Sequence, residues 1–296
     1  MSIQDFFATR PVFTHEEFAG FLEAEEPRSA RATESTLAYY TKTGRILRVR
    51  RELYVSVPPG AKPDTCPVAP YLLTAKITDD AVLSYHTALE FHGKAYSVHN
   101  KFWYLTKQHL ARPLKLKGYD FHRVSYPKAL LSKSMEAFGV DDLERSGLNV
   151  RVTSLERTLV DLLDKPKFGG GWEEIWRSLE SVEFFDLDKV IEYSLMLENA
   201  TTTAKVGFFL EQHRNALMVE EKHLDILRKH LPKSPHYVER KSKKPGRYVA
   251  GWNLIVPVDV LERTWQEVGA VPYLPTAFRH ALNSDGRIPK RAMLPS

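Results

Sequence analysis

Residues 32–57 read ATESTLAYYTKTGRILRVRRELYVSV, and this stretch decides the architecture that we predict for the start of the 296-residue chain. Residues 32–43 have the apolar spacing of a helix with one inward face, and Gly44 ends the helix because glycine tolerates the left-handed conformation found there. Residues 46–50 and 53–57 are rich in β-branched and aromatic side chains and are separated by a two-residue reversal. The stretch therefore predicts a helix followed by a basic β-hairpin.

Two shorter helices are expected before this stretch. Residues 3–9 have helical spacing, and Thr14 and Glu17 have the spacing of a capping box ahead of a short apolar helix. Three helices followed by a basic hairpin is the element order of a winged helix-turn-helix. We therefore predict a winged helix-turn-helix DNA-binding domain over residues 1–60, and a helix-and-hairpin module that binds protein is the alternative.

The distribution of charge favours DNA as the partner. Residues 1–26 carry one arginine and six carboxylates, whereas residues 27–62 carry eight lysines and arginines and two glutamates. A recognition helix presents polar donors to base edges, and a wing presents cations to phosphate. The predicted DNA-contacting residues are Arg28, Arg31, Thr33, Ser35, Tyr39, Lys42, Arg48, Arg50 and Arg51. A second basic cluster, over residues 240–247, is interpreted as a solvated face.

Three segments resemble one protein family. They are residues 36–57, residues 81–93 (AVLSYHTALEFHG) and residues 153–163 (TSLERTLVDLL). Together they resemble the AbiEi antitoxins, which are transcriptional regulators of type IV (abortive infection) toxin–antitoxin operons, and the resemblance covers roughly residues 30–165. One departure lies at the tip of the wing, where such proteins often have glycine and this chain has Glu52, whose carboxylate would repel phosphate.

The resemblance implies a function. It implies a repressor that binds repeated sites in its own promoter and counteracts a nucleotidyltransferase-like toxin through its C-terminal domain, with no cofactor. Two alternatives stay open: a metal-dependent nucleic-acid-processing enzyme delivered by a winged helix, and a standalone regulator that senses a ligand.

The rest of the chain predicts a second, larger domain. Prolines spaced between residues 58 and 70 predict a semi-rigid linker over residues 61–78 that is not helical. We expect an α+β domain with a mixed sheet and a helical C-terminal part over residues 79–296. The expected strands are 81–83, 101–107, 119–126, 148–152 and 248–256, and the last of them is expected to bring Trp252 and Ile255 to the core. The expected helices are 85–92, 153–163, 172–181, 187–197, 203–213 and 220–231. Residues 283–296 are expected to be loosely held.

Within the helix expected at 153–163, local spacing makes specific predictions. Thr153 and Glu156 have capping-box spacing, and leucines form an inward stripe. Arg157 and Asp161 are predicted to form an i,i+4 pair on the solvent side.

Composition excludes several classes of protein. The chain is 43% apolar, which is enough for real cores, and its one cysteine, Cys66, cannot form an internal disulfide and indicates a reducing compartment. No signal peptide and no apolar run of about 20 residues is found. We expect a cytoplasmic protein that does not enter membranes.

Motifs with catalytic chemistry are incomplete. Residues 186–188 (DLD) lack a preceding Gly-Ser nucleotide turn, residues 220–222 (EEK) are interpreted as a helix start, and residues 169–171 (GGG) lack the residues of a phosphate loop. His86, His92 and His99 are interpreted as core or surface histidines, because no acidic or thiol partner is expected nearby. The sequence therefore predicts no catalytic residues and no metal site.

Overall fold

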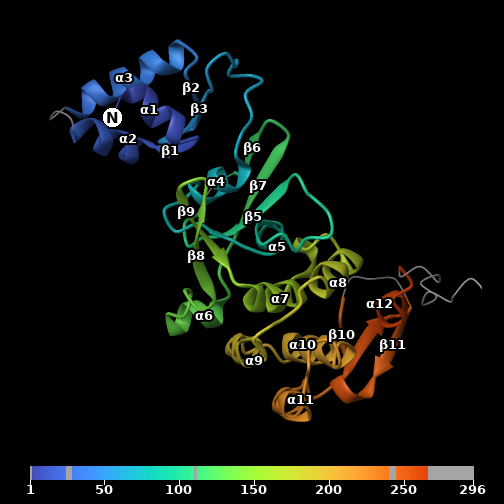
Figure 1. The fold of residues 1–296 in the computed structure, drawn as a ribbon. Helices are drawn as coiled ribbons and strands as arrows, with labels where there is room; N and C mark the ends of the chain where they lie inside the picture. Colours follow the sequence, from blue (N-terminus) through green and yellow to red (C-terminus); the bar gives the residue numbers. More distant parts are fainter. Residues whose placement is uncertain (1, 25–28, 110–111, 240–244, 266–296) are drawn as a thin grey trace, which may run out of the picture.

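The computed structural model describes residues 2–24, 29–109, 112–239 and 245–265, and it has a mixed α+β fold, as predicted. Figure 1 shows an N-terminal unit at one end, a six-stranded sheet in the middle, and a helical part with a small sheet at the other end. None of the helices in the described ranges is long and apolar enough to cross a bilayer.

The N-terminal unit contains the predicted helices and hairpin, with one additional strand. Its elements are α1 (Ile3–Thr9), β1 (Val12–Thr14), α2 (His15–Glu23), α3 (Ala30–Lys42), β2 (Ile46–Arg50) and β3 (Leu53–Ser56). The three strands form an antiparallel sheet in the order β1-β3-β2. The capping box that begins α2 is confirmed, since the Thr14 hydroxyl accepts from the Glu17 N–H at 3.2 Å. Strand β1 was missed because three residues are too few to show an alternating pattern.

Both faces of this small sheet are buried. Phe13 and Tyr54 face the helices and share a core with Leu37 of α3. Val12 and Val55 face the other way and join a core that continues into the second unit. This explains why every residue of β3 is buried.

The prediction that residues 61–78 are a non-helical linker is wrong over α4 (Pro70–Ala75). Pro70 occupies the first turn of this helix, where its missing N–H costs no hydrogen bond. Leu72 and Leu73 are buried between the N-terminal sheet and the six-stranded sheet. The segment therefore joins the two units through a packed core, and Figure 1 shows α4 at their junction.

The six-stranded sheet has the order β6-β7-β5-β4-β9-β8 and mixed direction. Its strands are β4 (Val82–Leu83), β5 (Lys101–Leu105), β6 (Leu114–Leu116), β7 (Tyr119–Val124), β8 (Val140–Arg145) and β9 (Leu148–Thr153), and α5 (His86–Phe91) and α6 (Lys128–Lys133) follow β4 and β7. Pairs β4–β9 and β5–β7 are parallel. The four strands predicted in this region are confirmed, whereas two edge strands were missed: β6 has only three residues, and the side chains of β8 are largely exposed and carry little apolar signal.

The C-terminal part consists of helices followed by a three-stranded sheet. Its elements are α7 (Leu155–Asp164), η1 (Pro166–Phe168), α8 (Trp172–Glu180), α9 (Leu187–Met196), α10 (Ala200–Gln212), α11 (Glu221–Arg228), β10 (His236–Tyr237), β11 (Gly246–Val249), η2 (Ala250–Trp252), β12 (Leu254–Pro257) and α12 (Val258–Glu262). The single strand predicted at 248–256 is in fact the hairpin β11–β12. Trp252, in the turn, is buried against Gly207, where a Cβ would come within 2.0 Å of the indole ring. Ile255, predicted to be in the core, is only half-buried, and its neighbours Leu254 and Val256 are buried instead. Residues 283–296 lie outside the described residues.

Helix α7 differs from its prediction in two ways. Its N-cap is Ser154, whose hydroxyl accepts from the Arg157 N–H at 3.3 Å, and not Thr153. The pair of Arg157 and Asp161 is buried, with exposed fractions of 0% and 2%, although the sequence placed it on the solvent side. The spacing rule identified the pair correctly, but α9 and residues 136–138, which precede β8, pack over the side of α7 that local spacing assigned to water.

Candidate functional site

The first candidate site is the outer face of α3. Arg31, Ser35, Ala38 and Lys42 recur at helical spacing on one face, and all four are exposed. The exposed side of α3 also carries Tyr39, which is 62% exposed. Ala38, at the centre of this face, leaves room for a ligand to approach the helix closely. The cationic donors Arg31 and Lys42 lie on either side of it.

Thr33 does not belong to this face. Its side chain is 2% exposed and packs inward, one helical turn from the buried Leu37. The prediction that Thr33 reaches a base edge is therefore wrong, because the inward stripe of α3 includes position 33. Arg28 lies outside the described residues.

A groove separates α3 from the tip of the hairpin. It has a volume of about 610 Å³, and its basic lining residues include Lys42, Arg48 and Arg51. Glu34 and Glu52 line it as well, and Arg51 lies 3.5 Å from Glu52 in an exposed ion pair. The groove therefore gathers three predicted cations from two elements, but two carboxylates offset part of their charge.

Arg50 faces the opposite way from Arg51. Its guanidinium donates to the backbone carbonyl of Ile77 at 2.5 Å, across the junction with the second unit. An ion pair between Lys76 and Glu17 lies at the same junction. The structure does not place Arg50 with the other cations of the wing, because its side chain is half-buried and bonds to the second unit.

Glu52 adopts a left-handed backbone conformation with φ of 62°. Its carbonyl accepts from the His15 N–H at 2.9 Å, which ties the turn to the start of α2. Residues other than glycine pay a steric cost of about 1–2 kcal/mol in this region. The departure from glycine noted in the sequence therefore falls at the position where glycine would relieve backbone strain.

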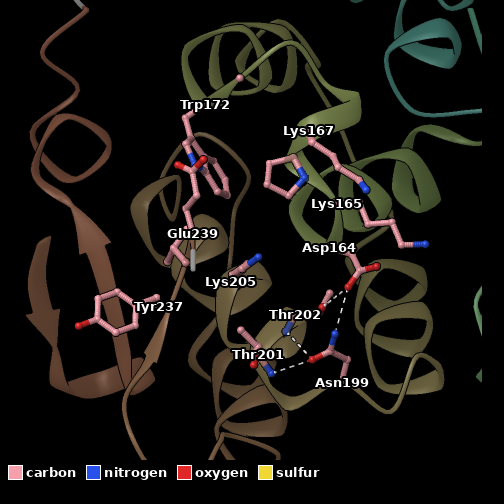
Figure 2. Close-up of a pocket in the computed structure, with 13 residues that line it drawn as sticks. Asp164, Lys165, Lys167, Trp172, Asn199, Thr201, Thr202, Lys205, Tyr237 and Glu239 are labelled. Atoms are coloured by element: carbon pink, nitrogen blue, oxygen red, sulfur yellow. Dashed lines mark hydrogen bonds between the residues drawn. The ribbon is translucent and has the colours of Figure 1, made fainter. Parts of the chain in front are cut away.

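The second candidate site is a cavity of about 530 Å³ between α7, α8, α10 and β10. In Figure 2, Lys205 lies between Glu239 on one side and Lys165 and Asp164 on the other. The Lys205 ammonium donates to the carbonyl of Leu163 at 3.0 Å and lies 5.9 Å from the centre of the Trp172 ring. The volume lies in the range of small-molecule sites.

Several polar groups of this cavity are already paired with one another. The Asp164 carboxylate accepts from Thr202 at 2.6 Å and from Asn199 at 3.1 Å, and the Asn199 side chain caps α10. Figure 2 draws these bonds along the lower wall of the cavity. The arrangement stabilises the ends of α7 and α10, so the cavity is the weaker of the two candidates described so far.

The third candidate site is a cluster that sequence reasoning missed. His86 and His99 stack with ring centres 3.7 Å apart, and Glu90 and Glu174 approach His86 from either side at 3.0 Å. The premise that no acidic partner lies nearby is wrong, because Glu90 lies one helical turn after His86. The i,i+4 spacing of His86 and Glu90 on α5 was the available signal. His92 is elsewhere and contacts the Thr153 carbonyl at 2.8 Å.

Electrostatics in this cluster favour ionised carboxylates and a neutral His99. Burial alone would raise the pKa of Glu90, but the adjacent His86 imidazole and the His99 backbone N–H hold that pKa below its ordinary value. Burial likewise opposes ionisation of Glu174, yet hydrogen bonds from Ser97 and His86 lower its pKa. Burial lowers the pKa of His99. Two negative groups and a half-buried imidazole therefore surround one buried imidazole.

The incomplete catalytic motifs have structural roles. The Asp186 side chain accepts from the Lys189 N–H at 3.2 Å and caps α9, as predicted. Glu220 precedes α11 and pairs with Lys222 on the surface. Gly170 and Gly171 have φ of 83° and 112° in the turn that leads into α8.

Comparison with known proteins gives a structural likeness and no match in sequence. No family model matches the chain, and no curated protein matches it. The fold is similar to the crystal structure of the Rv2827c protein from Mycobacterium tuberculosis, with a TM-score of 0.52 and 15% sequence identity over 85% of this chain and 88% of that one. At this identity the likeness concerns the fold alone.

Proposed function

We propose that this protein is a DNA-binding transcriptional repressor whose N-terminal unit is a winged helix-turn-helix. The observation that carries the proposal is the exposed face of α3, with Arg31, Ser35 and Lys42 on it, next to a hairpin that carries Arg48 and Arg51. The element order α1-β1-α2-α3-β2-β3 and the sheet order β1-β3-β2 support it. In this arrangement α3 is the recognition helix, and β2, β3 and their turn are the wing.

Docking between the two units leaves this face open. The N-terminal sheet contacts the second unit through Val12, Leu53 and Val55, on the side opposite to the helices. Because α3 packs on the other side of the sheet, the second unit does not cover it, and in Figure 1 α3 lies on the far side of the N-terminal unit from α4. A major groove about 12 Å wide accepts one helix in this way.

The proposed contacts divide into two kinds. Arg31 and Ser35, in the N-terminal half of α3, are placed to read base edges, and Tyr39 stands beside them. Lys42, Arg48 and Arg51 surround the groove behind them and are placed to meet phosphates. Arg50 orients the wing indirectly, through its bond to Ile77.

The biological setting rests on the resemblance to the AbiEi antitoxins. We propose a cytoplasmic, non-catalytic antitoxin that represses its own operon at repeated promoter sites and counteracts a nucleotidyltransferase-like toxin encoded next to it. Rescue of growth when this chain is co-expressed with the product of the neighbouring reading frame tests this part. Turnover of DNA or RNA by the purified chain with Mg²⁺ would favour the enzymatic alternative.

DNA binding is tested by footprinting the full chain on the region upstream of its own gene. The expected result is protection of repeated sites at physiological salt, which is lost in a variant with both Arg31→Ala and Arg51→Ala. The matched control is Lys229→Ala combined with Lys222→Ala, which removes two exposed cations of α11 and the residue after it. Equal footprints from both double variants, or no protection by the native chain at low salt, would contradict the proposal.

A further inference from the structure

We propose that His86, Glu90 and His99 form a binding site for one divalent first-row transition-metal ion of the zinc type. The inference goes beyond DNA binding and does not depend on it. One ligand atom from each of these residues lies within 4.8 Å of the other two. Imidazole nitrogens together with one carboxylate are a common donor set for such ions.

Hydrogen bonding fixes which nitrogen of His86 is available. Nε2 of His86 lies 3.0 Å from Oε1 of Glu174 in a hydrogen bond, and an ionised carboxylate only accepts, so Nε2 carries the proton. In the neutral imidazole Nδ1 then has a lone pair; the doubly protonated ring would instead pair with both glutamates, and a bound metal ion would displace the Nδ1 proton. Nδ1 lies 3.0 Å from Oε1 of Glu90 without hydrogen-bond geometry, and among the described residues it has no hydrogen-bond partner, although the side chain is fully buried.

Hydrogen bonding also determines which nitrogen of His99 is protonated. The Ser97 hydroxyl has one proton and gives it to Oε2 of Glu174 at 2.6 Å, so at 3.1 Å it accepts from Nε2 of His99. In the neutral imidazole, Nδ1 of His99 therefore also carries a lone pair. Glu174 and Ser97 thus set both tautomers from outside the cluster, which is the role that outer carboxylates play for histidines that bind metals.

Two imidazole lone pairs and a carboxylate oxygen at these distances repel one another unless a proton on Nδ1 of His86 or a metal ion lies between them. Glu90 is held in place by Tyr71, which donates to Oε2 at 2.9 Å, and by the His99 backbone N–H, which donates to Oε1 at 2.7 Å. Oε1 keeps a second lone pair for a metal. Its 3.0 Å distance from Nδ1 of His86 is a few tenths of an ångström shorter than the ligand–ligand separation of about 3.3 Å in a tetrahedral site with bonds of about 2.0–2.1 Å.

The His99 ring completes the site by a small rotation. The two rings are stacked parallel within 7°, so lone pairs in their planes do not meet at one point, and coordination requires the His99 ring to tilt relative to that of His86. His99 lies in the segment between α5 and β5 and is half-buried. The ring packs closely against Gly170, where a Cβ would come 2.7 Å from Cε1 of His99.

The test uses the full chain freed of metal by a chelator and then titrated with Zn²⁺, with Co²⁺ as a spectroscopic probe. We expect one ion per chain, a rise in melting temperature on binding, and a Co²⁺ visible spectrum typical of nitrogen and oxygen ligands. His99→Ala removes a half-buried ligand without opening the core and should weaken Zn²⁺ binding at least about 100-fold. Ser97→Ala should weaken it by about 10–100-fold, as outer-shell substitutions do.

The matched control is His230→Ala, which removes an exposed histidine far along the chain at the end of α11. It should leave Zn²⁺ affinity and the metal-induced rise in melting temperature unchanged. The proposal is overturned if the native chain binds no ion in the micromolar range. It is also overturned if His99→Ala, folded by circular dichroism, binds Zn²⁺ as tightly as His230→Ala, because the ion would then sit on surface histidines.

Discussion

Helices α3 and α7 each place an arginine four residues before a polar partner, yet the two arginines have opposite roles. Arg31 precedes Ser35 on α3, and both side chains are exposed. Arg157 precedes Asp161 on α7, and both are buried, with the guanidinium donating to the carbonyls of Glu136 and Phe138 at 2.8 and 2.6 Å. The same local spacing therefore yields a cation available to a partner in one helix and a cation that holds the core together in the other.

The contacts of Arg157 show that its side chain stabilises the core. Tyr193 donates to Asp161 at 2.7 Å, and burial raises the pKa of that carboxyl. The arginine lies 3.5 Å from Asp161 and between the rings of Tyr126 and Tyr193. The motif that resembles the antitoxin family in this region thus encodes a polar network inside the core.

The largest expected effect comes from breaking this network. Arg157→Met leaves Asp161 buried without its cation and should lower the free energy of unfolding by about 3–5 kcal/mol. Chemical denaturation measures the change. Removing both charges, as Arg157→Met with Asp161→Leu, should recover most of the loss, because no charge is then buried alone. A loss below about 1 kcal/mol in the single variant would show that the pair is not buried as described.

The corresponding change on α3 should affect binding and not folding. Arg31→Ala should cost about 1–3 kcal/mol of affinity for the native upstream site and relax its sequence preference, if the side chain reads a base. Its free energy of unfolding should change by less than about 0.5 kcal/mol, as for exposed positions in general. Competition with random DNA is the informative measurement, since an equal loss on both would reassign Arg31 to phosphate.

Arg50 and Arg51, adjacent in the wing, show the same contrast between a structural arginine and an arginine available to a partner. Arg51→Ala should reduce the slope of log affinity against log salt by about 0.9, the effect of one phosphate contact. Arg50→Ala should leave that slope unchanged and instead lower the free energy of unfolding, because its bond to the Ile77 carbonyl is lost. DNA affinities of both variants, measured over a range of salt concentrations, test which arginine contacts phosphate. A smaller slope for Arg50→Ala would show that Arg50 also contacts DNA.

Sequence reasoning succeeded where one element determines the outcome. The capping box at Thr14, the cap at Asp186 and the hairpin after Gly44 all follow from contacts within a few residues. It failed where a distant element determines the environment: α4 lies in a proline-rich stretch but is stabilised by two sheets, and Arg157 is buried by elements before and after α7.

The candidate sites likewise divide into features set by local sequence and features set by tertiary packing. Exposure of the α3 face could be anticipated from helical periodicity alone, and so could the inward placement of Thr33, which lies four residues before the inward Leu37. The cluster around His86 combines α5, the following loop and α8, so only the contact of His86 with Glu90 was visible in the sequence. Residues separated by more than 70 positions, such as Ser97 and Glu174, meet only through tertiary packing.

The smallest expected effect concerns Glu52, where strain and charge are combined in one residue and two substitutions separate them. Glu52→Gly removes the steric cost of φ at 62° and should raise the free energy of unfolding by up to about 1 kcal/mol. It also removes a carboxylate that pairs with Arg51, so affinity for DNA should rise. Glu52→Gln removes only the charge, so it should raise affinity to a similar degree without raising stability. If Glu52→Gln leaves affinity unchanged while Glu52→Gly raises it, the wing acts through its backbone conformation, and the carboxylate does not oppose binding.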